Sequence, residues 1–142
     1  MSDEMGFTTR LDLPVDEAID QVIAELKKEG FGILTRIDVH DALKEKIGAD
    51  FRQYTILGAC NPELAHRALM AQPEVGLLMP CNVVVESALD GGIVVRFMNP
   101  RIMMQMGALG EDVALREVAE EAAEKIERVV RTFDDAFIAE MD

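Results

Sequence analysis

The chain has 142 residues, which is enough for one domain with an adequate core but short for two, so we predict a single domain over residues 1–142. Apolar residues make up 49 % and charged residues 29 %, a composition typical of globular rather than disordered proteins. Fourteen Lys and Arg stand against 27 Asp and Glu, a net charge of −13 at pH 7. A chain this acidic repels phosphate, so we expect neither nucleic acid nor an anionic membrane as its partner.

Membrane and secretion signals are also missing from the sequence. Every apolar run is shorter than the roughly 18 residues that span a bilayer. Residues 1–4 are acidic, unlike the basic and then apolar start of a secretory signal. The two cysteines, Cys60 and Cys81, are expected to be free thiols, because a chain of this length folds without disulfides. These features predict a cytoplasmic protein.

Hydrophobic periodicity predicts strands and helices in turn over the first half of the chain. The predicted elements are a strand at 7–13, a helix from Val15 that Gly30 ends, a strand at 31–37, a short helix at 39–47, a strand at 51–60 and a helix at 62–71. We expect Asp38 to cap the short helix and Gly48 to end it. Asn61 and Pro62 are a strong start for the third helix, with Asn as the cap and Pro in the first turn.

The second half predicts a hairpin followed by a long helix. Residues 75–87 resemble a long apolar strand, which Pro80 makes an edge strand or bulges. A turn at 90–92 leads into a strand at 93–98, and a Met-rich connection precedes a helix over 111–140. Glu121 with Lys125 and Glu124 with Arg128 have the spacing of ion pairs within that helix.

Five strands, four helices and a hairpin in this order predict an α+β fold with an at least partly antiparallel sheet. The apolar face of the last helix, which runs from Leu115 to Phe133 and Phe137, is expected to pack across that sheet.

Each cysteine is followed by asparagine, at Cys60-Asn61 and Cys81-Asn82. Cys60 lies at a helix N-terminus, where free N–H groups and the helix dipole favour a thiolate, so it is a candidate nucleophile. Neighbouring strands could bring the two thiols together as a redox pair or as half of a soft-metal site. The alternative is that both are small buried apolar residues. No CxxC motif decides between these interpretations.

Three further groups of residues are weaker candidates. His66 lies one turn into the helix that Asn61 opens and could join Cys60 as a base or a ligand. Its place beside the apolar stripe favours a surface histidine, and His40 has less to support it. Four methionines gather late in the chain: Met98, Met103, Met104 and Met106. They could supply thioethers to Cu(I), an adaptable apolar wall or a dimer surface. Neither a carboxylate pair nor a metal-ligand cluster is evident, so we expect no metal and no cofactor.

Several sequence blocks together resemble one known family. They are Gly30-Phe31-Gly32-Ile33-Leu34-Thr35, Leu57-Gly58-Ala59-Cys60-Asn61-Pro62 and Leu78-Met79-Pro80-Cys81-Asn82. The chain is similar, from about Phe7 to Phe137, to the bacterial and archaeal family called domain of unknown function 302. The resemblance implies a TATA-box-binding-protein-like fold, in which a curved, mainly antiparallel five-stranded sheet grips a long C-terminal helix, with additional short helices. It also implies a homodimer, but no settled activity, and DNA binding does not follow from such a fold.

Three hypotheses of function follow. The first is a small-molecule-binding module with a cleft for a small, partly apolar ligand. The cleft would be formed by these residues: Cys60, Asn61, Pro80, Cys81, Asn82, Met98 and Met103. The second is an enzyme of redox or sulfur metabolism with Cys60 as its nucleophile. The third is a structural or regulatory homodimer without a ligand, assembled through its Met-rich and apolar surface.

Overall fold

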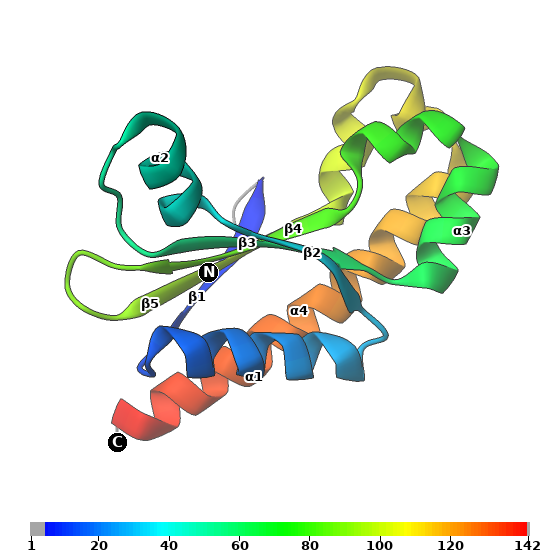
Figure 1. Ribbon diagram of the computed structural model, residues 1–142. Helices are drawn as coiled ribbons and strands as arrows, with labels where there is room; N and C mark the ends of the chain where they lie inside the picture. Colours follow the sequence, from blue (N-terminus) through cyan, green and yellow to red (C-terminus); the bar gives the residue numbers. More distant parts are fainter. Residues whose placement is uncertain (1–4, 142) are drawn as a thin grey trace.

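The computed structural model describes residues 5–141, with side chains through residue 136, and is built on one five-stranded antiparallel sheet (Figure 1). The α-helices and strands, in chain order, are β1 (Gly6–Leu11), α1 (Val15–Lys28), β2 (Gly32–Asp38), α2 (Val39–Ile47), β3 (Tyr54–Cys60), α3 (Pro62–Ala71), β4 (Cys81–Ser87), β5 (Ile93–Met98) and α4 (Val113–Met141). Three 3-10 helices join them, namely η1 (Pro73–Leu78), η2 (Pro100–Gln105) and η3 (Gly107–Glu111). The α+β fold class is confirmed.

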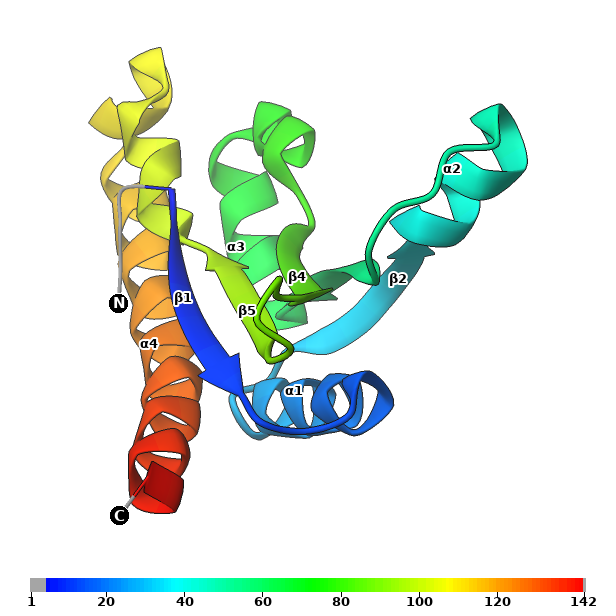
Figure 2. The same cartoon turned by 90° about the vertical axis from the view of Figure 1, so that its left-hand side faces the viewer.

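The strands run in the order β1-β5-β4-β3-β2, and every neighbouring pair is antiparallel. The predicted turn at 90–92 joins β4 to β5, and Gly91 takes the positive φ of 97° that the turn requires. Figure 2 shows the sheet curving from β1, beside α4, to β2, which carries α2 away from the rest of the molecule. We refer to residues 34–53, the outer part of β2, α2 and the loop that follows, as the α2 arm.

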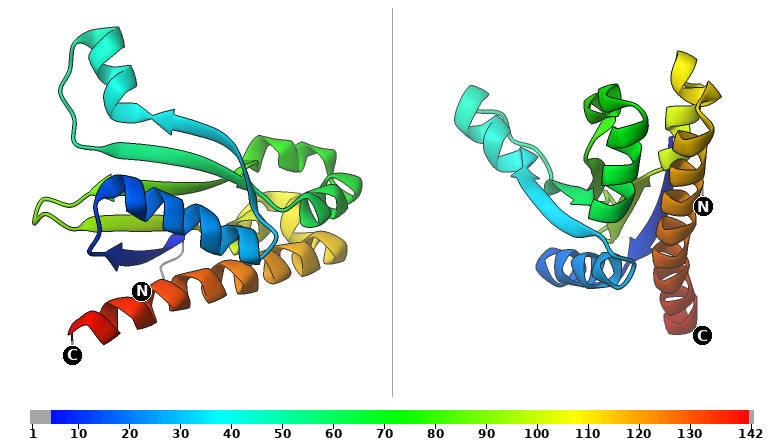
Figure 3. Two further views of the ribbon diagram at one scale, coloured as in Figure 1. Left: turned by 60° about the horizontal axis from the view of Figure 1, so that its bottom comes forward. Right: turned by 90° about the vertical axis from the view of Figure 1, so that its right-hand side faces the viewer.

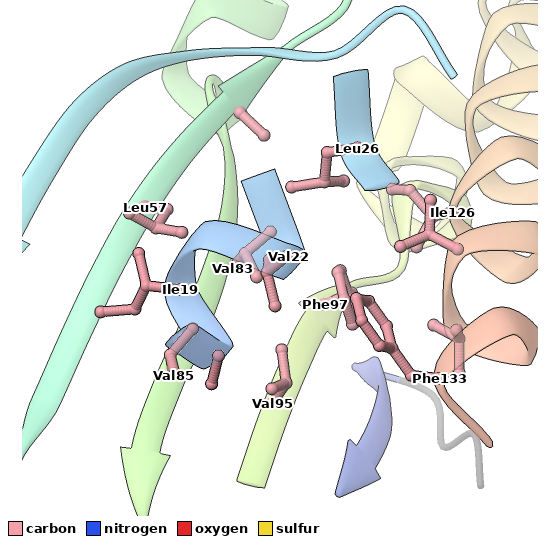
Figure 4. Packing of buried hydrophobic residues seen from close by; sticks show 14 of the residues in the cluster. Ile19, Val22, Leu26, Leu57, Val83, Val85, Val95, Phe97, Ile126 and Phe133 are labelled. Carbon is pink, nitrogen blue, oxygen red and sulfur yellow. The ribbon is translucent and has the colours of Figure 1, made fainter. Parts of the chain in front are cut away.

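One face of the sheet is covered by α1 and α4, and the main core lies between these layers (Figure 4). Alternate residues of the strands point into it, as the period of two predicts. On the helices, Val22 and Leu26 of α1 and Ile126 and Phe133 of α4 fill the same space. Buried apolar area is the main driving force for folding, so this layer fixes how the sheet and the two helices are arranged. Phe137, predicted to continue the apolar face of α4, lies outside the described side chains.

A second, smaller apolar cluster lies beyond the end of the sheet, where α3, η1 and η3 pack on the first half of α4 (Figure 3). Its buried members are Leu64, Ala68, Val75, Leu109, Leu115, Val118 and Ala122. The long helix α4 therefore serves both clusters, with its N-terminal half in the second and its C-terminal half in the first.

The prediction of a strand over 75–87 was wrong in its first half. Residues 73–78 form η1, a cis peptide bond joins Met79 to Pro80, and β4 begins only at Cys81. Proline donates no hydrogen bond to a sheet, so the strand starts after Pro80 instead of bulging around it. The edge-strand interpretation was also wrong, because β4 is the central strand of the sheet.

One predicted side-chain role was also wrong. Asp38 precedes α2 but makes no capping hydrogen bond; its Oδ1 accepts from the Thr55 hydroxyl at 2.8 Å instead. Gly48 does end α2 with a left-handed residue. The nearest ion-pair partners of the charged face of α4 come from other elements, as in Arg128 with Glu29 and Glu121 with Arg67. These pairs tie α4 to its neighbours, in addition to supporting the helix itself.

Candidate functional site

A small cavity of about 50 Å³ lies at the seam between the two apolar clusters. It is placed where β3 ends and β4 begins, and α3, η1, η2 and α4 complete its wall. The lining residues are Phe31, Ala59, Cys60, Asn61, Leu64, Ala65, Ala68, Val75, Leu78, Met79, Pro80, Cys81, Pro100, Met103, Val118 and Ala122. Within the described chain this wall contains no charged side chain.

Strand pairing places both thiols in this wall. Ala59 of β3 is the register partner of Cys81 in β4, so Cys60 is one residue beyond the partner of Cys81. Cys60 is the last residue of β3 and Cys81 is the first of β4, and both are half-buried free thiols. Both cysteines therefore line one cavity from neighbouring strands, while their pairing as a redox couple or as metal ligands stays a prediction.

Burial keeps both thiols neutral at physiological pH. Desolvation raises the pKa of Cys60 above its ordinary value. Desolvation, reinforced by the neighbouring Cys60, raises the pKa of Cys81 to about 11. A cysteine nucleophile needs the opposite shift, because the thiolate is the reactive form. Desolvation at Cys60 acts against the thiolate that a helix N-terminus favours, which weakens the hypothesis of a thiol enzyme.

Asn61 lies in the wall, but its amide is committed to the fold. Its Oδ1 accepts from the backbone N–H of Leu64 at 3.2 Å, which is the predicted N-cap of α3. Its Nδ2 donates to the carbonyl oxygen of Glu29 at 3.2 Å and so holds the turn after α1. The expectation that this amide is offered to a ligand has no support in these contacts.

Two of the predicted site residues do not line the cavity. Asn82 is exposed and lies opposite Gly58 on the other face of the sheet, because side chains alternate along β4 and Cys81 takes the inner position. Met98 pairs with Gly6 on that same outer face. The geometry therefore brings Cys60, Asn61, Pro80, Cys81 and Met103 together and leaves these two out.

The Met-rich segment is partly buried and partly exposed. Met103 lines the cavity and is 7 % exposed, Met104 packs beside the second cluster, and Met106 is 46 % exposed. Met79, which sequence reasoning missed, also lines the cavity. Met79 falls within the predicted strand over 75–87, and Pro80 is the one sequence signal that the strand does not run through this position. His66 is exposed and lies outside the wall.

No group of three or more His, Cys, Asp or Glu side chains within the described residues is placed to hold a metal ion. No described helix is long and apolar enough to cross a membrane.

The fold and cavity define an α+β protein with an apolar, thiol-containing site at one end of an antiparallel sheet. The family model described as "Domain of unknown function DUF302" matches residues 7–133, and the chain belongs to this family. A similar solved structure is an uncharacterized conserved DUF302 protein from Bacillus stearothermophilus, with 29 % identity and a TM-score of 0.78 over 91 % of this chain and 98 % of that one. No protein of curated function matches the chain.

Proposed function

We propose that the protein is a binding module whose cavity takes a small, uncharged, partly apolar ligand. The cavity with two neutral thiols in its wall carries this proposal. A charged ligand would lose its hydration there without gaining an ion-pair partner. The only amide in the wall, that of Asn61, is already hydrogen-bonded at both ends.

The size of the cavity limits the ligand. Its volume of about 50 Å³ is well below the ~150 Å³ of an apolar cavity that holds benzene. A ligand of about three non-hydrogen atoms gains at most roughly 4.5 kcal/mol, which corresponds to a Kd of about 1 mM. Binding of a simple organic ligand must therefore be sought at millimolar concentration.

Methyl NMR spectroscopy with dimethyl sulfide as the probe, and formate as a charged probe of similar size, tests the proposal. We expect dimethyl sulfide to shift the methyl signals of Val118 and Ala68 saturably, and formate to leave them unchanged. Ala65→Leu fills the cavity and should abolish the shifts. Ala71→Leu is the matched control, because Ala71 is on the same helix and half-buried but outside this wall. Unmoved cavity signals in the wild type, or equal loss in both variants, would refute the proposal.

We infer two broader properties from the same features. Two free thiols on neighbouring strands suit a reducing compartment, which supports a cytoplasmic location. The antiparallel sheet and the long α4 support the finer assignment to a TATA-box-binding-protein-like architecture. The charge of −13 weighs against nucleic acid as a partner even so.

We further propose that the chain forms a homodimer through the sheet face opposite α1 and α4, which we call the open face. Within the described chain no helix packs along this face (Figure 1). Strand register places one row of side chains across it: Thr8, Arg96, Val84, Ile56 and Ile37. Half of the Ile37 residue is exposed, so the apolar end of the row is in solvent.

The α2 arm extends this surface. Helix α2 has nine residues, and none of them is buried. Ile47 is 73 % exposed and Phe51 43 % exposed. A helix this short gains little stability by itself and depends on packing against other elements. In a single chain the apolar side chains of α2 lack such packing. Coverage by a partner would bury them.

Charge favours a second copy as that partner. The arm contains four basic and four acidic residues, so ten of the 14 basic and 23 of the 27 acidic residues lie elsewhere. Two copies that each carry −13 repel one another through most of their surface. The neutral arm is where they approach at the lowest electrostatic cost.

Sedimentation equilibrium tests this second proposal. We expect a dimer for the wild type, a monomer for Ile37→Glu, and a dimer for Leu77→Glu. Leu77 is 88 % exposed but lies in η1, at the other end of the molecule. A monomeric wild type, or dissociation by Leu77→Glu alone, would refute the assignment.

A further inference from the structure

Four sulfur-containing residues line the cavity within the described chain. Two are the cysteines Cys60 and Cys81, and two are the methionines Met79 and Met103. They come from the end of β3, the turn before β4, the start of β4 and η2, which are far apart in sequence. The remaining wall is formed by apolar side chains and the hydrogen-bonded Asn61. Among the side chains of this wall, those of the cysteines and methionines therefore offer the ligand atoms that a metal ion could bind.

The volume of about 50 Å³ favours an ion over an organic molecule. A ligand of a few carbon atoms is limited to about millimolar affinity by its small contact area. A metal ion held by sulfur is not subject to this limit, because its coordination bonds are strong and need only a small space. The thiols also lie on neighbouring strands in a defined register, which holds two potential ligands in place before any ion arrives.

The ligand chemistry selects the kind of metal. Thiolates and thioethers select Cu(I), whereas Mg²⁺ and Ca²⁺ take oxygen ligands. Structural Zn²⁺ takes four Cys, His or carboxylate ligands, and this wall contains two cysteines, no histidine and no carboxylate. The net charge of −13 attracts cations as strongly as it repels phosphate.

We propose that this cavity is a Cu(I) site in which Cys60 and Cys81 bind as thiolates and the thioether of Met103 or Met79 completes the coordination. The inference goes beyond the proposed function: it gives the same cavity a cation whose charge the two thiolates balance, whereas the binding module above takes an uncharged ligand. Copper enters and stays as Cu(I), so no electron is transferred. Two S–H bonds break, two Cu–S bonds form, and the two protons pass to solvent. Affinity should therefore fall as the pH is lowered.

The test is an anaerobic titration with Cu(I) in competition with a chromophoric Cu(I) chelator. We expect one Cu(I) per chain in the wild type. Cys60→Ser and Cys81→Ser should each weaken binding by at least ~100-fold, and Met103→Leu by about 10-fold. Met106→Leu should bind as the wild type does, because Met106 is 46 % exposed and outside the wall. X-ray absorption of the loaded wild type should show sulfur neighbours and no nitrogen or oxygen.

The same variants decide the outcome. Cys60→Ser changes a half-buried position and should fold, so the test stays decisive even if Cys81→Ser does not fold. Wild-type affinity in Cys60→Ser, or nitrogen and oxygen around the bound copper, would overturn the site. If Cu(I) binding fails while dimethyl sulfide still enters the cavity, only the copper inference is lost. If neither binds, the binding module itself is refuted.

Discussion

Ionisation of the Cys81 thiol lowers the free energy of unfolding as the pH rises through the alkaline range. Its pKa is about 11 in the folded chain against an ordinary value of 9.0, because burial disfavours the thiolate. A raised pKa stabilises the folded state fully below pH 9, where both states hold the proton. Above pH 9 the unfolded chain ionises first, so stability is lost as the pH rises toward 11. Each unit of pKa difference corresponds to 1.36 kcal/mol, so the loss reaches up to about 1.4 kcal/mol at pH 10.

Urea unfolding followed by circular dichroism, under reducing conditions from about pH 8 to pH 10, measures this loss. Cys81→Ala is the control, because it lacks the titrating group and retains Tyr54 and all the lysines. Its own packing defect lowers stability at every pH and cancels in the comparison. We expect the wild type to lose up to about 1.4 kcal/mol more than the variant over this range. Parallel curves would show that Cys81 is not desolvated and would remove the physical basis of the site.

Substitutions at three positions test other parts of the structure, each by urea unfolding. Asn61→Ala removes both the cap of α3 and the hydrogen bond to the turn after α1, and should lower the free energy of unfolding by about 2 kcal/mol. Asn61→Asp keeps only the cap, so its stability should lie between those of the wild type and Asn61→Ala. Glu86→Gln should cost about 2 kcal/mol, because the buried carboxylate accepts hydrogen bonds from two half-exposed arginines; an unchanged midpoint would mean that these bonds add nothing. Val75→Ala should also lower the free energy of unfolding by about 2 kcal/mol, because it enlarges the cavity. Tighter binding of dimethyl sulfide would be independent evidence of that enlargement.

The sequence predicted most of the fold because its local signals agree with the tertiary structure. The apolar spacing of α1 and the alternation in β1 and β5 mark the residues that face the core. Gly48 at the end of α2 and Gly91 in the turn between β4 and β5 are positions where the backbone takes a positive φ. Asn61 and Pro62 begin α3 as their chemistry requires. In each case one local interaction is enough to decide the structure.

The errors occur where a long-range contact decides. In residues 75–79, Val75 belongs to the second cluster and Leu78 and Met79 pack against it, and a short apolar segment of this kind has no period that separates a strand from a 3-10 helix. The ion pair of Arg128 with Glu29 of α1 is likewise a long-range contact, which the spacing of charges along α4 does not indicate. Strand order, and with it the central place of β4, is set by pairing that no local pattern reveals.

The repeated Cys-Asn step illustrates which part of a motif carries information. Asn61 caps a helix and Asn82 points to the open face, so the shared asparagine does not indicate a shared role. The cysteines are alike for another reason: Cys60 ends β3, and Cys81 begins the next strand. In an antiparallel pair the end of one strand lies beside the beginning of the other, whatever the length of the connection. Residues at these positions therefore lie at the same end of the sheet, where both cysteines line the cavity at the seam between the two apolar clusters that share α4.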